Sequence, residues 1–152
     1  MNLFSKNLTN LKIFFLVLLI LYPTGMICIV NQKVLITEFM ALNNNGLKDE
    51  DNDFSDWIEL YNPGETSVDL AGWHLSDDRD DLGKWTFPSI SIGAGDYLII
   101  YASDKNRTDV TANLHTNFKL SGGGEYLALV EADTNYISYE YAPTFPAQQT
   151  DV

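Results

Sequence analysis

The chain has 152 residues, 45% of them hydrophobic, and a formal net charge of −12 at pH 7. This length gives room for one domain. Such an excess of acids repels nucleic acid and anionic membrane surfaces, and no cluster of Lys and Arg offsets it locally, so direct binding to DNA or RNA is not expected.

The first 30 residues differ in kind from the rest. Lys6 and Lys12 occur there without any acid, and an unbroken apolar run, residues 13–22, follows them. The pattern predicts a signal peptide or, if residues 13–30 stay in lipid, an N-terminal membrane anchor. Either way the remaining chain lies outside the membrane, so we expect an exported protein that is secreted or held at the cell surface.

The exported part has no disulfide, because the one cysteine, Cys28, lies in the N-terminal segment. It holds all 21 acids and only seven of the nine bases, which gives it a charge of −14. Such a charge favours solubility outside the cell and also the binding of divalent cations.

After residue 30 the helical period is absent, and short alternating runs rich in β-branched and aromatic residues recur between turns. The predicted strands are residues 34–42, 57–62, 68–75, 84–92, 97–103, 115–121, 125–132 and 136–142. About eight short strands without helices predict an all-β, two-sheet sandwich. Residues 97–103 are the most apolar and should be central. The aromatic residues expected to fill the core are Trp57, Trp73, Trp85, Phe87, Tyr97 and Tyr126.

Several stretches in consecutive order resemble the lamin tail domain family in its bacterial secreted form. They are ITEFMALNNNG, DEDNDFSDWIELYNPGETSVDLAGWHLSDD, KWTFP, GAGDYLIIYASDKN, LHTNFKLSGGGEYLALV and PAQQTDV. The resemblance implies an immunoglobulin-like β-sandwich over residues 34–152. The family pattern continues beyond QQTDV, so the last strand is expected to be incomplete and the chain to lead a longer protein.

The resemblance also implies a function. Bacterial members of this family accompany other extracellular domains, such as nucleases or kinase-like domains, as binding or structural accessories. The family has no agreed catalytic residues, so none can be carried over to this chain.

An acidic stretch precedes the strand at residues 57–62. Its oxygen-bearing side chains alternate as the early calcium ligands of an EF-hand loop do, and they belong to Asp49, Asp51, Asp53 and Ser55. The rest of that motif fails, because Phe54 stands where the turn requires Gly and Leu60 where a bidentate acid is needed. A looser calcium site that includes Asp56 is one hypothesis. The favoured one is a solvated loop in which Asp56 caps the turn before Trp57.

The other polar candidates favour structural roles. Residues 77–81 contain four aspartates and predict an exposed hairpin loop, and the glycines at 122–124 predict a hairpin turn rather than a phosphate site. His74 is expected at the surface or satisfied by a partner. His115 is expected in a loop, bonded to the backbone. Two separate histidines without a G-x-S-x-G motif argue against covalent catalysis.

The sequence therefore predicts a non-catalytic extracellular accessory module for binding, adhesion or spacing. One alternative is the N-terminal fragment of an extracellular enzyme with a downstream catalytic domain, and another is a calcium-stabilised spacer. The expected ligand is an extracellular protein or polysaccharide. No cofactor other than calcium is expected, and membrane contact is expected only through residues 13–30.

Overall fold

The computed structural model of the protein describes residues 33–134 and 136–151. The predicted signal peptide or anchor, residues 1–30, lies outside them. Every regular element in the described residues is a strand: β1 (Leu35–Met40), β2 (Asp56–Tyr61), β3 (Val68–Asp69), β4 (His74–Ser76), β5 (Trp85–Thr86), β6 (Ser91–Ile92), β7 (Tyr97–Ala102), β8 (Leu114–His115), β9 (Leu127–Val130) and β10 (Ile137–Tyr141). The described residues include no helix long and apolar enough to cross a membrane.

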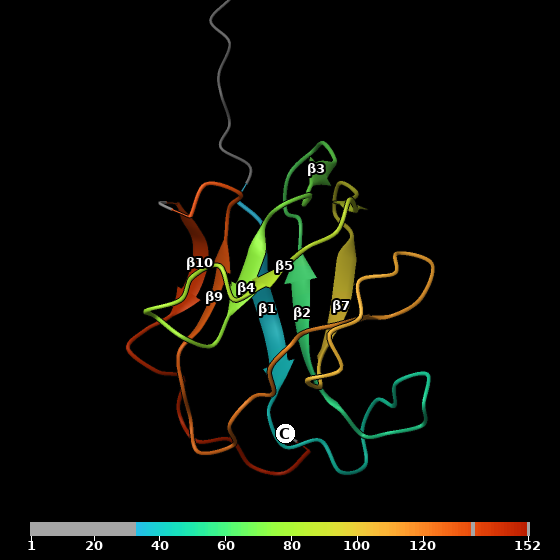
Figure 1. Ribbon diagram of the computed structural model, residues 1–152, viewed down its shortest axis with the longest axis vertical. Coiled ribbons are helices and arrows are strands. Elements are labelled where there is room, and N and C mark those ends of the chain that lie inside the picture. Colours follow the sequence, from blue (N-terminus) through green and yellow to red (C-terminus); the bar gives the residue numbers. More distant parts are fainter. Residues whose placement is uncertain (1–32, 135, 152) are drawn as a thin grey trace, which may run out of the picture. The chain divides into compact units, whose positions relative to one another are not determined.

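Two four-stranded sheets make the body of the fold (Figure 1). The first has the order β1-β2-β7-β8 and the second β10-β9-β4-β5, while β3 and β6 form a separate ribbon. Apolar side chains of both sheets meet in one buried cluster, in which Ile58 and Ile100 come from the first sheet and Leu75 and Leu129 from the second. The all-β sandwich prediction is confirmed.

Strand β7 is central, as its apolar composition predicts. It lies between β2 and β8, paired antiparallel with β2 and parallel with β8. The register places Asp56 opposite Ala102, so the chain just before β2 lies beside the chain just after β7. This pairing brings together two loops that are about 50 residues apart in sequence.

One of the predicted core aromatics is not in the core. Trp57, Trp85, Phe87 and Tyr126 are buried, and Trp73 packs partly buried against the core. The side chain of Tyr97, in contrast, is 59% exposed and stacks on Tyr61 with the ring centroids 4.5 Å apart. Alternation along β7 turns Leu98 and Ile100 to the core, so Tyr97 faces outward.

The predicted hairpin at the glycines 122–124 is also wrong. The strand before them, β8, belongs to the first sheet and the strand after them, β9, to the second, so this segment crosses between the sheets. Gly124 has a φ of +94°, and a Cβ built there would lie 2.4 Å from the carbonyl oxygen of Phe145. The crossover therefore requires glycine for backbone shape and for close contact.

The segment that contacts Gly124 is a C-terminal strap, residues 142–151, which follows β10 without forming a strand. Phe145 is 1% exposed and packs on Phe39, with the ring centroids 4.5 Å apart. Further along, the N–H of Gln148 donates to Gly122 O and the N–H of Asp151 to Leu42 O. The strap thus ends beside the C-terminal end of β1 (Figure 1). The expectation of an incomplete last strand concerns chain beyond Val152 and stays a prediction.

Candidate functional site

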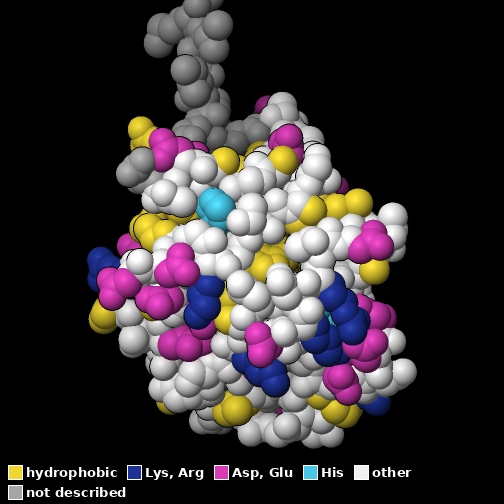
Figure 2. Space-filling model, in the orientation of Figure 1, with side chains coloured by type: hydrophobic (Ala, Val, Ile, Leu, Met, Phe, Trp, Pro, Cys, Tyr) yellow, Lys and Arg dark blue, Asp and Glu magenta, His cyan; other side chains and the backbone are white. Residues whose placement is uncertain are grey.

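The polar residues with the densest contacts lie on two neighbouring loops at one end of the first sheet. The acidic loop, residues 43–56, joins β1 to β2, and the basic loop, residues 103–113, joins β7 to β8. Pairing of β2 with β7 holds the two loops next to each other. Figure 2 shows acidic and basic side chains side by side over the lower right of the molecule, where Figure 1 places these loops.

The acidic loop folds around the carboxylate of Asp49, whose side chain has no exposed surface. One of its oxygens accepts hydrogen bonds from the backbone N–H groups of Asp51 (2.9 Å) and Asp53 (3.1 Å). The other accepts from the hydroxyl of Ser55 at 2.7 Å. An aspartate carboxylate that accepts a hydrogen bond from the backbone N–H two residues ahead closes a tight turn. This turn brings the alternate acids together.

The carboxylates of Asp49, Asp51 and Asp53 converge, as the alternating pattern predicts, with oxygens within 4.8 Å of one another. The ammonium of Lys105 lies among them, with Nζ 2.6 Å, 2.7 Å and 2.9 Å from the three carboxylates in turn. The cation held by these acids in the structure is thus supplied by the chain. Calcium at this place would compete with Lys105 and remains a prediction.

The structure separates the remaining two residues of the predicted site. Ser55 contributes to the cluster through its bond to Asp49. Asp56 does not: it starts β2, and its carboxylate accepts from the backbone N–H of Asn43 at 3.3 Å. The expectation of a merely solvated loop is wrong for Asp49, which is buried and ion-paired.

A second network surrounds Glu50, which points to the basic loop. Its carboxylate accepts from Arg107 at 2.6 Å, from the side-chain amide of Asn113 at 2.9 Å and from Nε2 of His115 at 3.0 Å. Nδ1 of His115 lies 2.7 Å from the hydroxyl oxygen of Ser103. The prediction for His115 is therefore wrong: it lies in β8, is fully buried, and has side-chain partners on both ring nitrogens.

These contacts shift the pKa values of the network. Burial alone would raise the pKa of Asp49, but hydrogen bonds from Lys105, Ser55 and the backbone lower it to about 2. Burial likewise opposes ionisation of Glu50, yet its hydrogen bonds hold its pKa well below the ordinary range. Burial alone would lower the pKa of Lys105, but its three carboxylate partners raise it above the ordinary value. The ion pairs are thus charged in neutral solution.

We expect the free energy of unfolding to fall as the pH drops from about 4 to about 2. Because the pKa of Asp49 is about 2 in the folded chain against 3.8 ordinarily, the unfolded chain binds the proton more readily. The stabilisation from ionised Asp49 is complete above its ordinary pKa and is lost as the pH falls through its pKa in the folded chain. Urea unfolding across this window should show a smaller loss in Asp49→Asn than in the wild type. The exposed control Glu65→Gln should keep the full loss, and equal losses in all three proteins would contradict the assignment.

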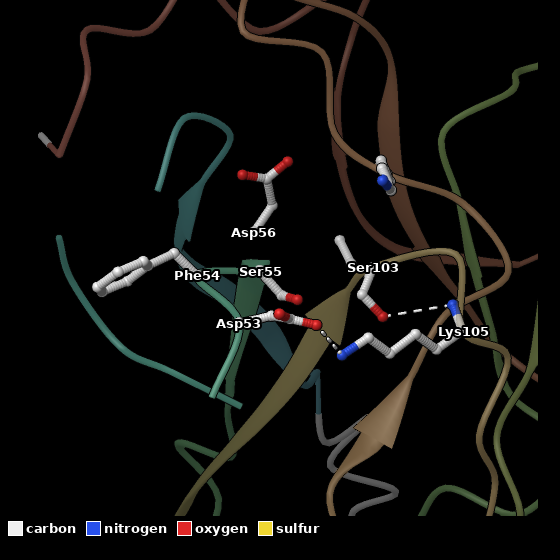
Figure 3. Close-up of a pocket in the computed structure, with 8 residues that line it drawn as sticks. Asp53, Phe54, Ser55, Asp56, Ser103 and Lys105 are labelled. Carbon is white, nitrogen blue, oxygen red and sulfur yellow. Dashed lines mark hydrogen bonds and ion pairs between the residues drawn. The ribbon is translucent and has the colours of Figure 1, made fainter. Parts of the chain in front are cut away.

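A cavity of about 250 Å³ opens between the two loops (Figure 3). Its walls are Asp53, Phe54, Ser55, Asp56, Ala102, Ser103, Lys105 and Lys119. Figure 3 shows the Asp53 carboxylate turned to the Lys105 ammonium, with Ser103 on the opposite side from Phe54. Burial raises the pKa of Asp56, the half-buried acid of this wall, above its ordinary value. The cavity is therefore lined by charged and hydroxyl groups of both loops.

The other candidates stand apart from this site. The aspartates at 77–81 lie in the hairpin loop between β4 and β5, where Asp77 pairs with Lys84 at 2.6 Å. His74 lies on β4 with Nδ1 3.0 Å from the hydroxyl of Thr86. Neither contributes to the loops around the cavity.

Sequence reasoning missed the basic loop. Lys105 and Arg107 follow the most apolar strand within five residues, and that position is the only sequence signal they carry. It becomes informative once β2 and β7 are known to be neighbours, because the acids before β2 must then face the bases after β7.

The comparison with known families gives one match. The model of the Lamin Tail Domain family matches residues 30–143, which include β1 to β10, both loops and all residues of the two networks. No curated protein matches the chain.

Proposed function

Because the chain belongs to the lamin tail domain family, whose fold is immunoglobulin-like, we propose that it is an extracellular accessory module that binds a partner and does not turn over a substrate. In domains of this architecture the sheets form a rigid scaffold. Binding residues commonly lie on the loops, where sequence changes have little effect on core packing. The acidic loop is the surface that we assign to binding.

Exposed apolar side chains on a fixed loop carry this proposal. Leu47 and Phe54 are 48% and 39% exposed, and the ammonium of Lys48 lies 4.6 Å from the centre of the Phe54 ring. Behind them the loop is tied to the rest of the domain by Lys105 and Arg107. A loop that is ordered before binding loses little entropy on binding, and aromatic side chains commonly carry much of the binding energy.

A binding experiment tests this assignment. Immobilised full-length chain would be exposed to an array of extracellular polysaccharides and to purified cell-surface proteins. Any ligand found should bind the double variant Leu47→Ser, Phe54→Ser at least tenfold more weakly. The control Tyr136→Ser removes a more exposed aromatic side chain, at 62%, far along the sequence and should leave binding unchanged. Equal weakening by both variants, or by neither, would contradict a binding surface on the acidic loop.

Export belongs to the same proposal and is supported by the two lysines and the apolar run that follows them in residues 1–30. Expression of the full gene followed by fractionation and N-terminal sequencing tests it. Secreted protein starting near residue 30 is the expected result for a signal peptide, and membrane-bound protein with an intact N-terminus is the expected result for an anchor. Cytoplasmic full-length protein would contradict export.

A further inference from the structure

Three residues of different segments form a continuous hydrogen-bonded array beside the cavity. Ser103 follows β7, His115 ends β8, and Glu50 lies in the acidic loop. The hydroxyl oxygen of Ser103 is 2.7 Å from Nδ1 of His115, and both oxygens of Glu50 are 3.0 Å from Nε2. The imidazole has no exposed surface and stacks on Tyr101.

The donor roles in this array follow from the carboxylate. An ionised carboxylate can only accept hydrogen bonds, so Nε2 of His115 carries the hydrogen and donates the hydrogen bond to Glu50. In the neutral imidazole Nδ1 is then an acceptor, and the hydroxyl of Ser103 donates to it. A serine hydroxyl bonded to a neutral imidazole whose far nitrogen is held by a carboxylate is the arrangement that activates serine nucleophiles. We infer that Ser103 is a nucleophile that accepts an acyl group from an activated ester.

The cavity gives such an ester access to Ser103. Ser103 is one of its lining residues and is 8% exposed, whereas His115 lies behind it. Lys119 is another lining residue, and its positive charge would favour an oxygen that becomes negative during attack. A small acyl group therefore suits a space of about 250 Å³ better than a polymer.

The reaction is an acyl transfer that balances without a further reagent. The oxygen of Ser103 attacks the ester carbonyl while His115 Nδ1 takes the hydroxyl proton. The bond from carbonyl carbon to the leaving oxygen then breaks, and the proton passes from Nδ1 to the released alcohol. The products are an ester on Ser103 and one alcohol, with Glu50 as a positioning residue that holds the imidazole.

The surroundings favour a single event over turnover. The N–H of Asp104 donates to Phe118 O, and the N–H of Lys105 lies 3.4 Å from the Ser103 oxygen itself. Neither donor is directed at an oxyanion, which slows both steps. The first step is helped by the good leaving group of an activated ester, whereas the ester on Ser103 has no such leaving group, so attack by water on it is the slower step. A slow second step leaves the acyl group on the chain and agrees with an accessory module that does not turn over a substrate.

A fluorophosphonate probe tests the nucleophile directly, because it phosphonylates an activated serine and releases fluoride. The full-length chain should gain one adduct, and peptide mapping by mass spectrometry should place it on Ser103. Three serines that are more exposed but lack a histidine partner, Ser89, Ser91 and Ser121, should stay unmodified. Ser103→Ala should abolish the adduct while the chain still unfolds cooperatively.

Glu50→Gln separates positioning from structural support. The glutamine oxygen can still accept from Nε2, but the charge that orients and stabilises the imidazolium is gone. We expect the maximal labelling rate to fall at least tenfold, within the range for loss of general-base assistance, with the half-saturating probe concentration unchanged. A disrupted cavity would change the half-saturating concentration instead.

Either of two results would overturn the inference. One is folded wild-type chain that gains no adduct at millimolar probe, and the other is labelling of the exposed serines at the same rate as Ser103. In both cases the hydroxyl of Ser103 would be a structural partner of His115 only.

Discussion

Replacing Phe145 by alanine is expected to lower the free energy of unfolding by about 4 kcal/mol, the range for a buried phenylalanine truncated to alanine. The side chain is 1% exposed and belongs to the core cluster, where it contacts Phe39. The strap also makes backbone hydrogen bonds, but among residues 142–151 Phe145 alone is buried. Urea unfolding of the variant and the wild type measures the difference.

The matched control is the neighbouring residue Thr144, which is exposed. Thr144→Ala should change the free energy of unfolding by less than about 0.5 kcal/mol, as surface substitutions usually do. A loss below about 1.5 kcal/mol in Phe145→Ala would mean that the sheets close without the ring and that the strap is dispensable.

Replacing Lys105 by methionine is expected to cost about 2 kcal/mol of stability, the order of magnitude for a buried charged group that loses its partner. The variant removes the ammonium shared by three carboxylates within 4.8 Å of one another. Asp51 keeps Arg107, with Nη2 at 2.7 Å, but the Asp49 carboxylate, which has no exposed surface, loses its cation. Thermal and urea unfolding at neutral pH measure the loss. Lys119→Met removes a charge from the same cavity wall, and Lys119 forms no ion pair within the described residues, so the substitution should be nearly neutral.

Calcium distinguishes the two hypotheses for the acidic loop. In the wild type the ion must displace the ammonium of Lys105, so we expect millimolar calcium to leave the unfolding temperature unchanged. In Lys105→Met this ammonium is gone and calcium meets only Arg107 at Asp51, 2.7 Å away. Calcium at about a hundred times its dissociation constant would then add about 2.7 kcal/mol, reversed by chelator. Equal stabilisation of both proteins would show that Lys105 does not block the ion, and would support the calcium-stabilised spacer.

Much of the fold follows from local patterns. The central place of β7 follows from its composition, since a strand with neighbours on both sides and a covered face needs apolar residues. The meeting of Asp49, Asp51 and Asp53 follows from their spacing, because alternate residues of a tight loop turn their oxygens to one centre. In both cases the evidence lies within a dozen residues.

The partners of the acidic loop could not be predicted in this way. Lys105 and His115 reach Asp49 and Glu50 across 56 and 65 residues of sequence. Their meeting depends on the strand order β2-β7-β8 and on a parallel pairing of β7 with β8 that involves two residue pairs. The prediction that Tyr97 lies in the core was wrong for a related reason: alternation separates the two faces of a strand but does not say which face is covered.

The path of the strap determines how the domain would respond to force. Asp151 bonds the backbone N–H groups of Asn44 and Asn45, and the strap contacts Gly122 and the core before it reaches β10. Tension from a following segment would therefore load these contacts one after another, ahead of any strand pairing. Fully extended, the ten residues 142–151 span at most about 35 Å, so peeling them would lengthen the chain while both sheets stay intact. For a module that spaces other domains, this segment would act as an extensible tether that absorbs a pull before the sandwich unfolds.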